Sequence, residues 1–255
     1  MHVHRVFFER HAATADGAAE SEAIDRLLGT WRRNGQVCGG EWPIAPEAHG
    51  YSVHVLTPEP DSLEARWNRR YVTEALAHVA NVGLAMRVEA KGKDQASADA
   101  CECPSPSAFV LFTTFVSLES SVRCLDCDRP VALHRFEPAN GDEHADLIGW
   151  QSDYQSCDRL QMNCTVLERA ATREMSAIDS ALSRSGRALC DALAASSGRP
   201  FYYYLYRNRG RSRRAKAEGP CPGCGGDWKL AERLHLFDFK CDRCHLLSNV
   251  SFSMR

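Results

Sequence analysis

The chain has 255 residues, of which 44% are hydrophobic and 25% charged, and its formal net charge is −2. These values are typical of globular proteins and exclude a disordered, fibrous or membrane-embedded chain. No apolar run reaches the roughly 18 residues that cross a bilayer, so we expect no membrane association and a cytoplasmic location. In that reducing compartment, twelve cysteines favour metal binding, packing or redox chemistry over disulfides.

An N-terminal domain with alternating strands and helices is expected over residues 1–96, because the apolar periodicity switches between the two types of element. Strands are predicted at His2–Phe8, Tyr51–Leu56 and Leu84–Val88, with helices at Glu20–Asn34 and from Asp61 or Ser62 to Gly83. The order β-α-β-α-β indicates a layered α+β or α/β arrangement.

A cysteine-containing β region is expected next, over residues 97–150, after a polar linker at Lys91–Ala100. Its predicted strands are Phe109–Leu118 and Pro130–Phe136, and a loop is predicted at Glu137–Asp146. The loop carries a cluster of acidic residues and a histidine, namely Asp142, Glu143, His144 and Asp146. We interpret the cluster as solvated loop, with a metal site as the alternative.

One long helix and an aromatic strand are predicted within residues 151–210. Apolar residues recur every three or four positions from about Cys164 to Ala195, and Gly198 and Pro200 end the pattern. Gly186 lies on the apolar face, which indicates that another element packs closely there. Phe201–Tyr206 then predicts a strand.

Residues 211–255 have the cysteine spacing of a zinc ribbon. Cys221, Cys224, Cys241 and Cys244 form two Cys-x2-Cys pairs separated by sixteen residues, and Gly225 or Gly226 can adopt the positive φ that such a turn needs. Strands are expected at Asp227–Ala231, Leu234–Lys240 and Leu246–Phe252. Four thiolates would close the coordination shell of one structural zinc ion. The alternative is unliganded core or redox cysteines.

A second zinc ion is predicted from Cys101, Cys103, Cys124 and Cys127. A redox dithiol at Cys124 and Cys127 is the alternative, although no strand-to-helix context of the thioredoxin type surrounds it. The other cysteines, Cys38, Cys157, Cys164 and Cys190, are expected to be small buried apolar residues.

The C-terminal part of the chain is basic. Residues 198–255 contain twelve Lys and Arg against five Asp and Glu, a surplus of seven, whereas the remainder carries −9. The aromatic run Phe201–Tyr206 leads into a basic segment composed of Arg207, Arg209, Arg211, Arg213, Arg214 and Lys216. Arginines pair with phosphates and tyrosines stack on unpaired bases, which favours a sequence-tolerant nucleic-acid contact. Alternatively, the tyrosines are buried in a sheet and the arginines form a solvated linker.

The chain resembles a bacterial family of zinc-ribbon-containing proteins of unknown function, to which nucleic-acid binding has been attributed. The resemblance rests on Trp150-Gln-Ser-Asp-Tyr-Gln-Ser-Cys-Asp-Arg-Leu-Gln, Leu182-Ser-Arg-Ser-Gly-Arg, Gly198-Arg-Pro-Phe-Tyr-Tyr-Tyr-Leu-Tyr-Arg, Phe239-Lys-Cys-Asp-Arg-Cys and Ser248-Asn. It extends through Leu111-Phe-Thr and Cys124-Leu-Asp-Cys127 and is weakest before residue 90. It implies that the ribbon cysteines are metal ligands.

The sequence therefore predicts an α+β protein that binds zinc and has no catalytic residues, with DNA or RNA as the expected partner. A protein-interaction adaptor, whose ribbon docks on another protein, is the second hypothesis. An enzyme with an unfamiliar site is the third hypothesis. It ranks below the other two because the sequence contains no phosphate loop, Gly-x-Gly-x-x-Gly turn, nucleophile elbow or His-Glu-x-x-His helix.

Overall fold

The computed structural model describes residues 1–11, 17–139, 141–207 and 219–250. The chain forms two compact units that interleave along the sequence. Unit 1 comprises residues 1–100, 118–120 and 130–145, and unit 2 comprises residues 101–117, 121–129 and 146–255. Each unit contains a sheet and helices, which confirms the predicted α+β class. Among the described residues, no helix combines the length and apolar character needed to cross a bilayer.

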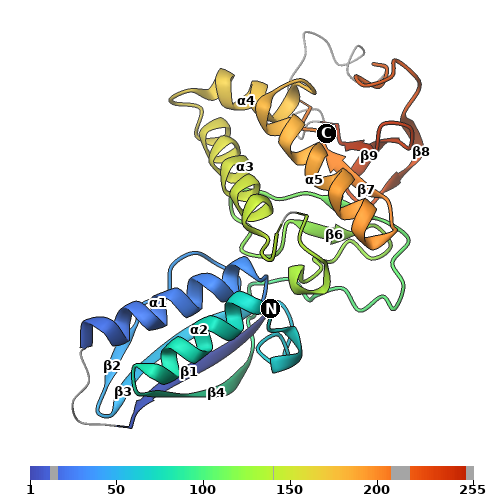
Figure 1. Cartoon of the computed structure of the whole chain (residues 1–255). Coiled ribbons are helices and arrows are strands. Elements are labelled where there is room, and N and C mark those ends of the chain that lie inside the picture. Colours follow the sequence, from blue (N-terminus) through green and yellow to red (C-terminus); the bar gives the residue numbers. More distant parts are fainter. Residues whose placement is uncertain (12–16, 140, 208–218, 251–255) are drawn as a thin grey trace. The chain divides into compact units, whose positions relative to one another are not determined.

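Unit 1 contains a four-stranded sheet in the order β2-β3-β1-β4. Its elements are β1 (His2–Arg10), α1 (Gly17–Arg33), β2 (Ala45–Glu47), β3 (Gly50–Thr57), α2 (Arg70–Asn81) and β4 (Leu84–Lys93). The strand β1 pairs antiparallel with both β3 and β4; Figure 1 draws β1 and β3 in blue and β4 in green. Each of the three strands and two helices predicted for this part of the chain is present, and β2 is additional.

The core of unit 1 lies between the sheet and the two helices. Alternate residues of β1, including Phe8, point to the same face of the sheet as Val55 of β3. Ile24 and Trp31 of α1 and Val79 of α2 pack against them, and all five side chains are at most 2% exposed. The apolar residues that recur at helical spacing in the sequence therefore lie on one face of each helix, and this face is buried.

The second helix begins later than predicted, at Arg70 instead of near Ser62. The Ser62 hydroxyl does not cap a helix, because it accepts a hydrogen bond from the Glu59 amide at 3.0 Å and donates one to the Glu59 carbonyl at 2.9 Å. A short 3-10 helix at Ala65–Trp67 and an extended Arg69 follow before α2 starts.

The predicted strand Pro130–Phe136 is wrong, because this segment contains a 3-10 helix at Leu133–Arg135 within unit 1. Both ring nitrogens of His134 are engaged, with Nδ1 at 3.1 Å from the Gly35 carbonyl and Nε2 at 3.2 Å from a Glu59 carboxylate oxygen. These two contacts join residues 99 and 75 positions apart in the chain, so local propensity does not reveal how the segment is fixed.

Unit 2 contains a six-stranded sheet in the order β6-β5-β7-β10-β9-β8. The strands are β5 (Phe109–Leu111), β6 (Val122–Cys124), β7 (Phe201–Tyr204), β8 (Lys229–Leu234), β9 (Phe237–Cys241) and β10 (Leu246–Ser248). Strand β7 pairs in parallel with β5 and β10, and the other pairs are antiparallel. The three expected ribbon strands are present, and β10 joins them to the rest of the sheet.

The strand predicted at Phe109–Leu118 ends at Leu111. The chain after Leu111 is instead held by two side chains of the helix at Ala145–Asn163. The Gln155 side chain donates to the Thr114 and Ser117 carbonyls at 3.1 and 2.7 Å, and the Asp158 carboxylate accepts from the Phe115 amide at 2.8 Å.

The long helix predicted from about Cys164 to Ala195 is instead two helices, α4 (Glu168–Ser176) and α5 (Ala181–Ser197), and a helix that was not predicted, α3 (Ala145–Asn163), precedes them. The chain leaves the helical conformation at Cys164 and Leu167, which both have φ of 53°. Ser180 then caps α5 by accepting a hydrogen bond from the Ser183 amide at 3.0 Å. Gly198, with φ of 68°, ends α5 as predicted.

Helix α5 packs closely on strand β7, as the position of Gly186 indicated. A Cβ atom at Gly186 would lie 2.3 Å from the Tyr203 ring and 2.6 Å from the Trp150 indole nitrogen. Tyr203 is fully buried on this face, and Tyr204 on the same strand contacts the Phe112 and Phe237 rings. Strand β7 is therefore covered on both faces.

Candidate metal centres

Two groups of four cysteines converge in unit 2. Within each group, all four sulfur atoms lie within 4.8 Å of one another. We call Cys101, Cys103, Cys124 and Cys127 the central centre, and Cys221, Cys224, Cys241 and Cys244 the ribbon centre. Zn–S bonds of about 2.3 Å imply sulfur separations of about 3.8 Å in a tetrahedral site. The donor type and spacing of both groups fit a tetrahedral metal ion.

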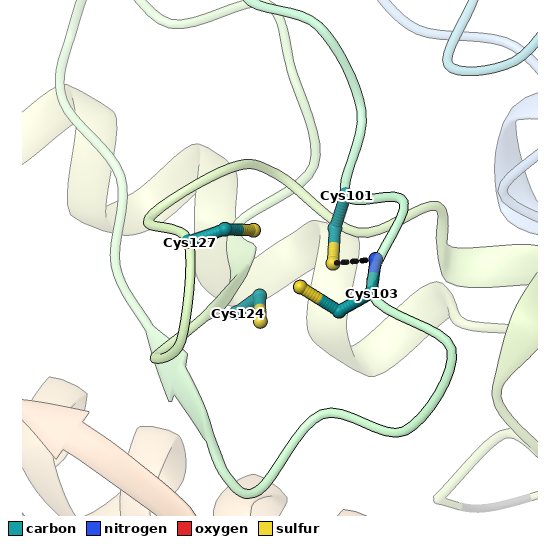
Figure 2. A group of neighbouring side chains, drawn as sticks. All are labelled: Cys101, Cys103, Cys124 and Cys127. Carbon is teal, nitrogen blue, oxygen red and sulfur yellow. Dashed lines mark hydrogen bonds between the residues drawn. The ribbon is translucent and has the colours of Figure 1, made fainter.

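The central centre is assembled from two segments. Cys101 and Cys103 precede β5, whereas Cys124 is the last residue of β6 and Cys127 lies in the turn that follows. Figure 2 shows the four side chains gathered around a common space. The Cys103 amide donates to the Cys101 sulfur at 3.4 Å, and the Asp126 amide donates to the Cys124 sulfur at the same distance. Such amide hydrogen bonds stabilise thiolates.

The ribbon centre has a similar construction. Cys221 and Cys224 precede β8, Cys241 is the last residue of β9, and Cys244 lies in the turn to β10. The Cys224 and Cys241 sulfurs are 3.6 Å apart. At Gly223 an added Cβ would lie 2.8 Å from the Cys244 sulfur, so the first turn needs a glycine there.

Each Cys-x2-Cys turn is followed by a residue with positive φ. These residues are Asp128, Gly225 and His245, with φ of 58°, 73° and 48°. The Asp128 amide donates to the Cys124 carbonyl at 2.9 Å, and the Gly225 amide donates to the Cys221 carbonyl at 2.8 Å. The left-handed residue closes the turn so that both sulfurs point the same way. The sequence signals this only at Gly225, because Asp and His adopt the conformation less often.

The pKa values of the thiols differ within the centres. A hydrogen bond from the Gly226 amide lowers the pKa of Cys224 to about 7. Burial raises the pKa of Cys244 to about 12 and also raises that of Cys101. The protein alone therefore does not keep all four sulfurs of a centre ionised near neutral pH. A divalent cation bound at the centre would supply the positive charge that does so.

Carboxylates within the turns are anchored by residues that sequence reasoning missed. Asp126, in the central centre, accepts hydrogen bonds from the Ser107 hydroxyl and, at 2.7 Å, from the Ser107 amide. The hydroxyl and then the amide lower the pKa of Asp126. Asp242, in the ribbon centre, accepts from the Tyr202 hydroxyl at 2.5 Å and pairs with Lys240 at 2.8 Å. No local pattern links Ser107 or Tyr202 to a cysteine motif.

The structure decides between the two interpretations of the tyrosines in favour of burial in the sheet. Tyr202, Tyr203 and Tyr204 are at most 5% exposed, so they are packed in the sheet and do not offer ring faces for base stacking. The Arg207 guanidinium lies over the Phe239 ring, 4.0 Å from its centroid. The other residues of the basic segment, Arg209, Arg211, Arg213, Arg214 and Lys216, lie outside the described residues.

The acidic residues and the histidine of the 137–146 loop do not converge on a possible metal position. Among the described residues, only the two cysteine groups bring their ligand atoms close enough together to hold a metal ion. Glu143 pairs with Arg33 at 3.0 Å, and His144 is 2% exposed. His144 is therefore part of the unit 1 interior, and its interpretation as solvated loop is wrong.

The remaining cysteines differ in exposure. Cys190 is buried as predicted, whereas Cys38 and Cys157 are half-buried and Cys164 is exposed. Cys164 stands in the non-helical link after α3, which the sequence did not indicate.

Comparisons with known proteins match most of the chain in three consecutive parts. Residues 1–90, 103–206 and 210–254 match domains of unknown function, DUF8589, DUF2310 and DUF8594 respectively. A protein of Haemophilus influenzae described as uncharacterized is 34% identical over 259 residues, covering 99% of both chains. A second from the same organism, also described as uncharacterized, is 38% identical over 163 residues, covering 64% of this chain and 80% of its own.

No solved structure matches significantly. The near full-length match decides membership: the chain belongs to a bacterial family of uncharacterized proteins that includes these Haemophilus influenzae relatives and carries the DUF2310 domain.

Proposed function

We propose that each cysteine centre binds one structural zinc ion and that the protein has no catalytic role at either centre. The convergence of four sulfurs in each group supports this proposal. A shell of four thiolates suits zinc and leaves no open position for a reacting water molecule. The ions would fix the turns after β6 and β9, which contain Cys127 and Cys244.

Metal analysis of the purified protein tests the proposal. Two zinc ions per chain are expected, falling to one in Cys124→Ser and to one in Cys221→Ser, while Cys164→Ser, an exposed cysteine outside both centres, keeps two. Iron in place of zinc, or an unchanged zinc content in either ligand variant, would contradict the assignment.

We further propose that the protein binds nucleic acid through the basic segment beside the ribbon. The charge surplus of seven in residues 198–255 supports this proposal, and two ribbon thiolate charges beyond the zinc charge reduce it to about five. Since Arg207 packs on Phe239 and the tyrosines are buried, the contact would rest on the charges of the other five basic residues and their phosphate pairing.

A salt series with labelled double-stranded DNA, single-stranded DNA and RNA tests this second proposal. Replacing Arg209, Arg211, Arg213 and Arg214 with Ala should weaken binding and flatten its salt dependence by up to about four units of slope. The matched control replaces four helix arginines, Arg159, Arg169, Arg173 and Arg184, which are exposed on α3, α4 and α5. An equal loss in both variants would show only a general charge effect. No binding at low salt would favour the adaptor hypothesis and a search for a protein partner.

A further inference from the structure

The two metal centres terminate strands of the same sheet, at the same edge. Strands β5, β7 and β10 run in one direction, because β7 pairs in parallel with both neighbours. Strands β6 and β9 run in the opposite direction, since each is antiparallel to its neighbour β5 or β10. Cys124 ends β6 and Cys241 ends β9, so both centres begin where these two strands leave the sheet.

Only three strands separate these cysteines. In the pairing register, Cys124 lies opposite Phe109, and Phe109 lies opposite Phe201. On the other side of β7, Tyr203 lies opposite Leu246, which lies opposite Cys241. The backbone at one centre is thus connected to the other through a short row of strand pairs. The Tyr202 hydroxyl, from the same central strand, holds Asp242 of the ribbon centre.

A second connection runs directly from the ribbon to the central centre. The turn between β8 and β9 contains His235, whose Nε2 lies 2.7 Å from the carbonyl oxygen of Leu125. Leu125 stands between the ligands Cys124 and Cys127. A carbonyl only accepts, so Nε2 carries the hydrogen in this contact. His235 has φ of 54°, and Phe237 beside it packs edge-on against Phe112 at the end of β5.

We infer that zinc binding at the two centres is positively coupled, so that metal at one centre raises the affinity of the other. This inference rests on the proposal that both centres bind zinc. Metal at the ribbon centre orders β9, its turn and the β8–β9 hairpin, because ordering and binding are one free energy in small metal sites. The ordered hairpin then places His235 against Leu125 and fixes the turn that carries Cys124 and Cys127. By thermodynamic linkage, metal at the central centre must raise the affinity of the ribbon centre by the same factor.

Zinc affinities measured on the full-length chain by competition with a chelator test this inference. The Cys221→Ser/Cys224→Ser variant gives the affinity of the central centre alone, and Cys124→Ser/Cys127→Ser gives that of the ribbon centre alone. We expect the overall two-ion binding constant of the parent to exceed the product of these two constants by about tenfold or more.

Variants of the tether keep all eight ligands and so separate coupling from ligand loss. His235→Ala should reduce the coupling about fivefold, the effect of one hydrogen bond, and His235→Gln should restore part of it because its amide also donates. Glu232→Ala, an exposed residue on the same hairpin, is the matched control and should leave the coupling unchanged. In the Cys221→Ser/Cys224→Ser background, His235→Ala should change the central affinity little, because the hairpin is already released.

The outcomes distinguish the inference from the proposed function. A two-ion constant equal to the product of the single-centre constants overturns the coupling while leaving both zinc sites in place. A parent protein that binds fewer than two zinc ions overturns the proposed function and the coupling with it. If a serine variant loses both ions, the tether variants decide: an unchanged two-ion constant in His235→Ala overturns the role of this contact.

Discussion

His144 shows how one residue can make the stability of unit 1 depend on pH. Its side chain is 2% exposed, and burial, assisted by the charge of Arg69, lowers its pKa from 6.5 to about 4. Above pH 6.5 the ring is neutral in both the folded and unfolded states and contributes nothing. Between pH 6.5 and 4 the unfolded state takes up a proton that the folded state excludes, so stability falls as the pH is lowered.

The expected loss from this residue is about 3 kcal/mol by pH 4. Denaturant unfolding of the parent and of His144→Phe at pH 7, 6, 5 and 4 measures it, and the difference between the two curves isolates the contribution of this ring. The variant should lose less free energy of unfolding than the parent as the pH falls. Parallel pH dependences in the two proteins would refute the assignment.

At the scale of elements, the contact between α5 and β7 depends on the absence of a side chain at Gly186. Gly186→Ala would bring a methyl group within 2.6 Å of two buried rings, those of Tyr203 and Trp150. Overpacking of this kind costs about 1–3 kcal/mol, which outweighs the gain of up to about 1 kcal/mol in helix propensity. We expect a net loss in the free energy of unfolding.

Gly149 in α3 provides the matched control. It also lies inside a helix, but nothing stands within 4 Å of the position of an added Cβ. Gly149→Ala should therefore stabilise the protein by about 0.5–1 kcal/mol. Chemical denaturation of both variants measures the two effects, and equal signs would show that the close approach at Gly186 relaxes without cost.

The elements that the sequence predicts well are those whose signals are local. The spacing of the cysteines identifies the two groups of four that converge, and the apolar periodicity of residues 20–34 identifies α1. Both signals depend only on residues that are close together in the sequence. The helix α3 was missed because only Leu147, Trp150 and Tyr154 are buried on it, too few for a clear stripe. The apolar spacing also continues across the break before α5, which led to the prediction of one continuous helix. Ser180, the residue that caps α5, was the signal for a new helix start.

Contacts between distant residues account for most of the remaining errors. The segment at 130–136 has strand-like composition but is fixed by Glu59 and Gly35 of unit 1. For the aromatic run 201–204 the sequence leaves burial and base stacking open, and only the assembled sheet, which covers both faces of β7, decides for burial. The anchors of the metal-site carboxylates, Ser107 and Tyr202, likewise depend on the assembled sheet. A single sequence holds no direct record of these pairs.

At the scale of the whole molecule, both metal centres belong to unit 2, whereas unit 1 has a hydrophobic core without them. Removal of metal by a chelator should therefore destabilise the six-stranded sheet and leave the four-stranded sheet folded. Hydrogen exchange measured by mass spectrometry should show lost protection in β5–β10 and retained protection in β1, β3 and β4.

The segment at 130–145 provides a specific test of this prediction. It begins three residues after Cys127, yet it belongs to unit 1, where His134 contacts Glu59 and His144 is buried. If unfolding follows the compact units, protection should persist in the part of this segment around His134 while it disappears at residues 121–129. Loss of protection that instead spreads along the sequence from Cys127 into residues 130–145 would show that metal at the central centre also supports unit 1.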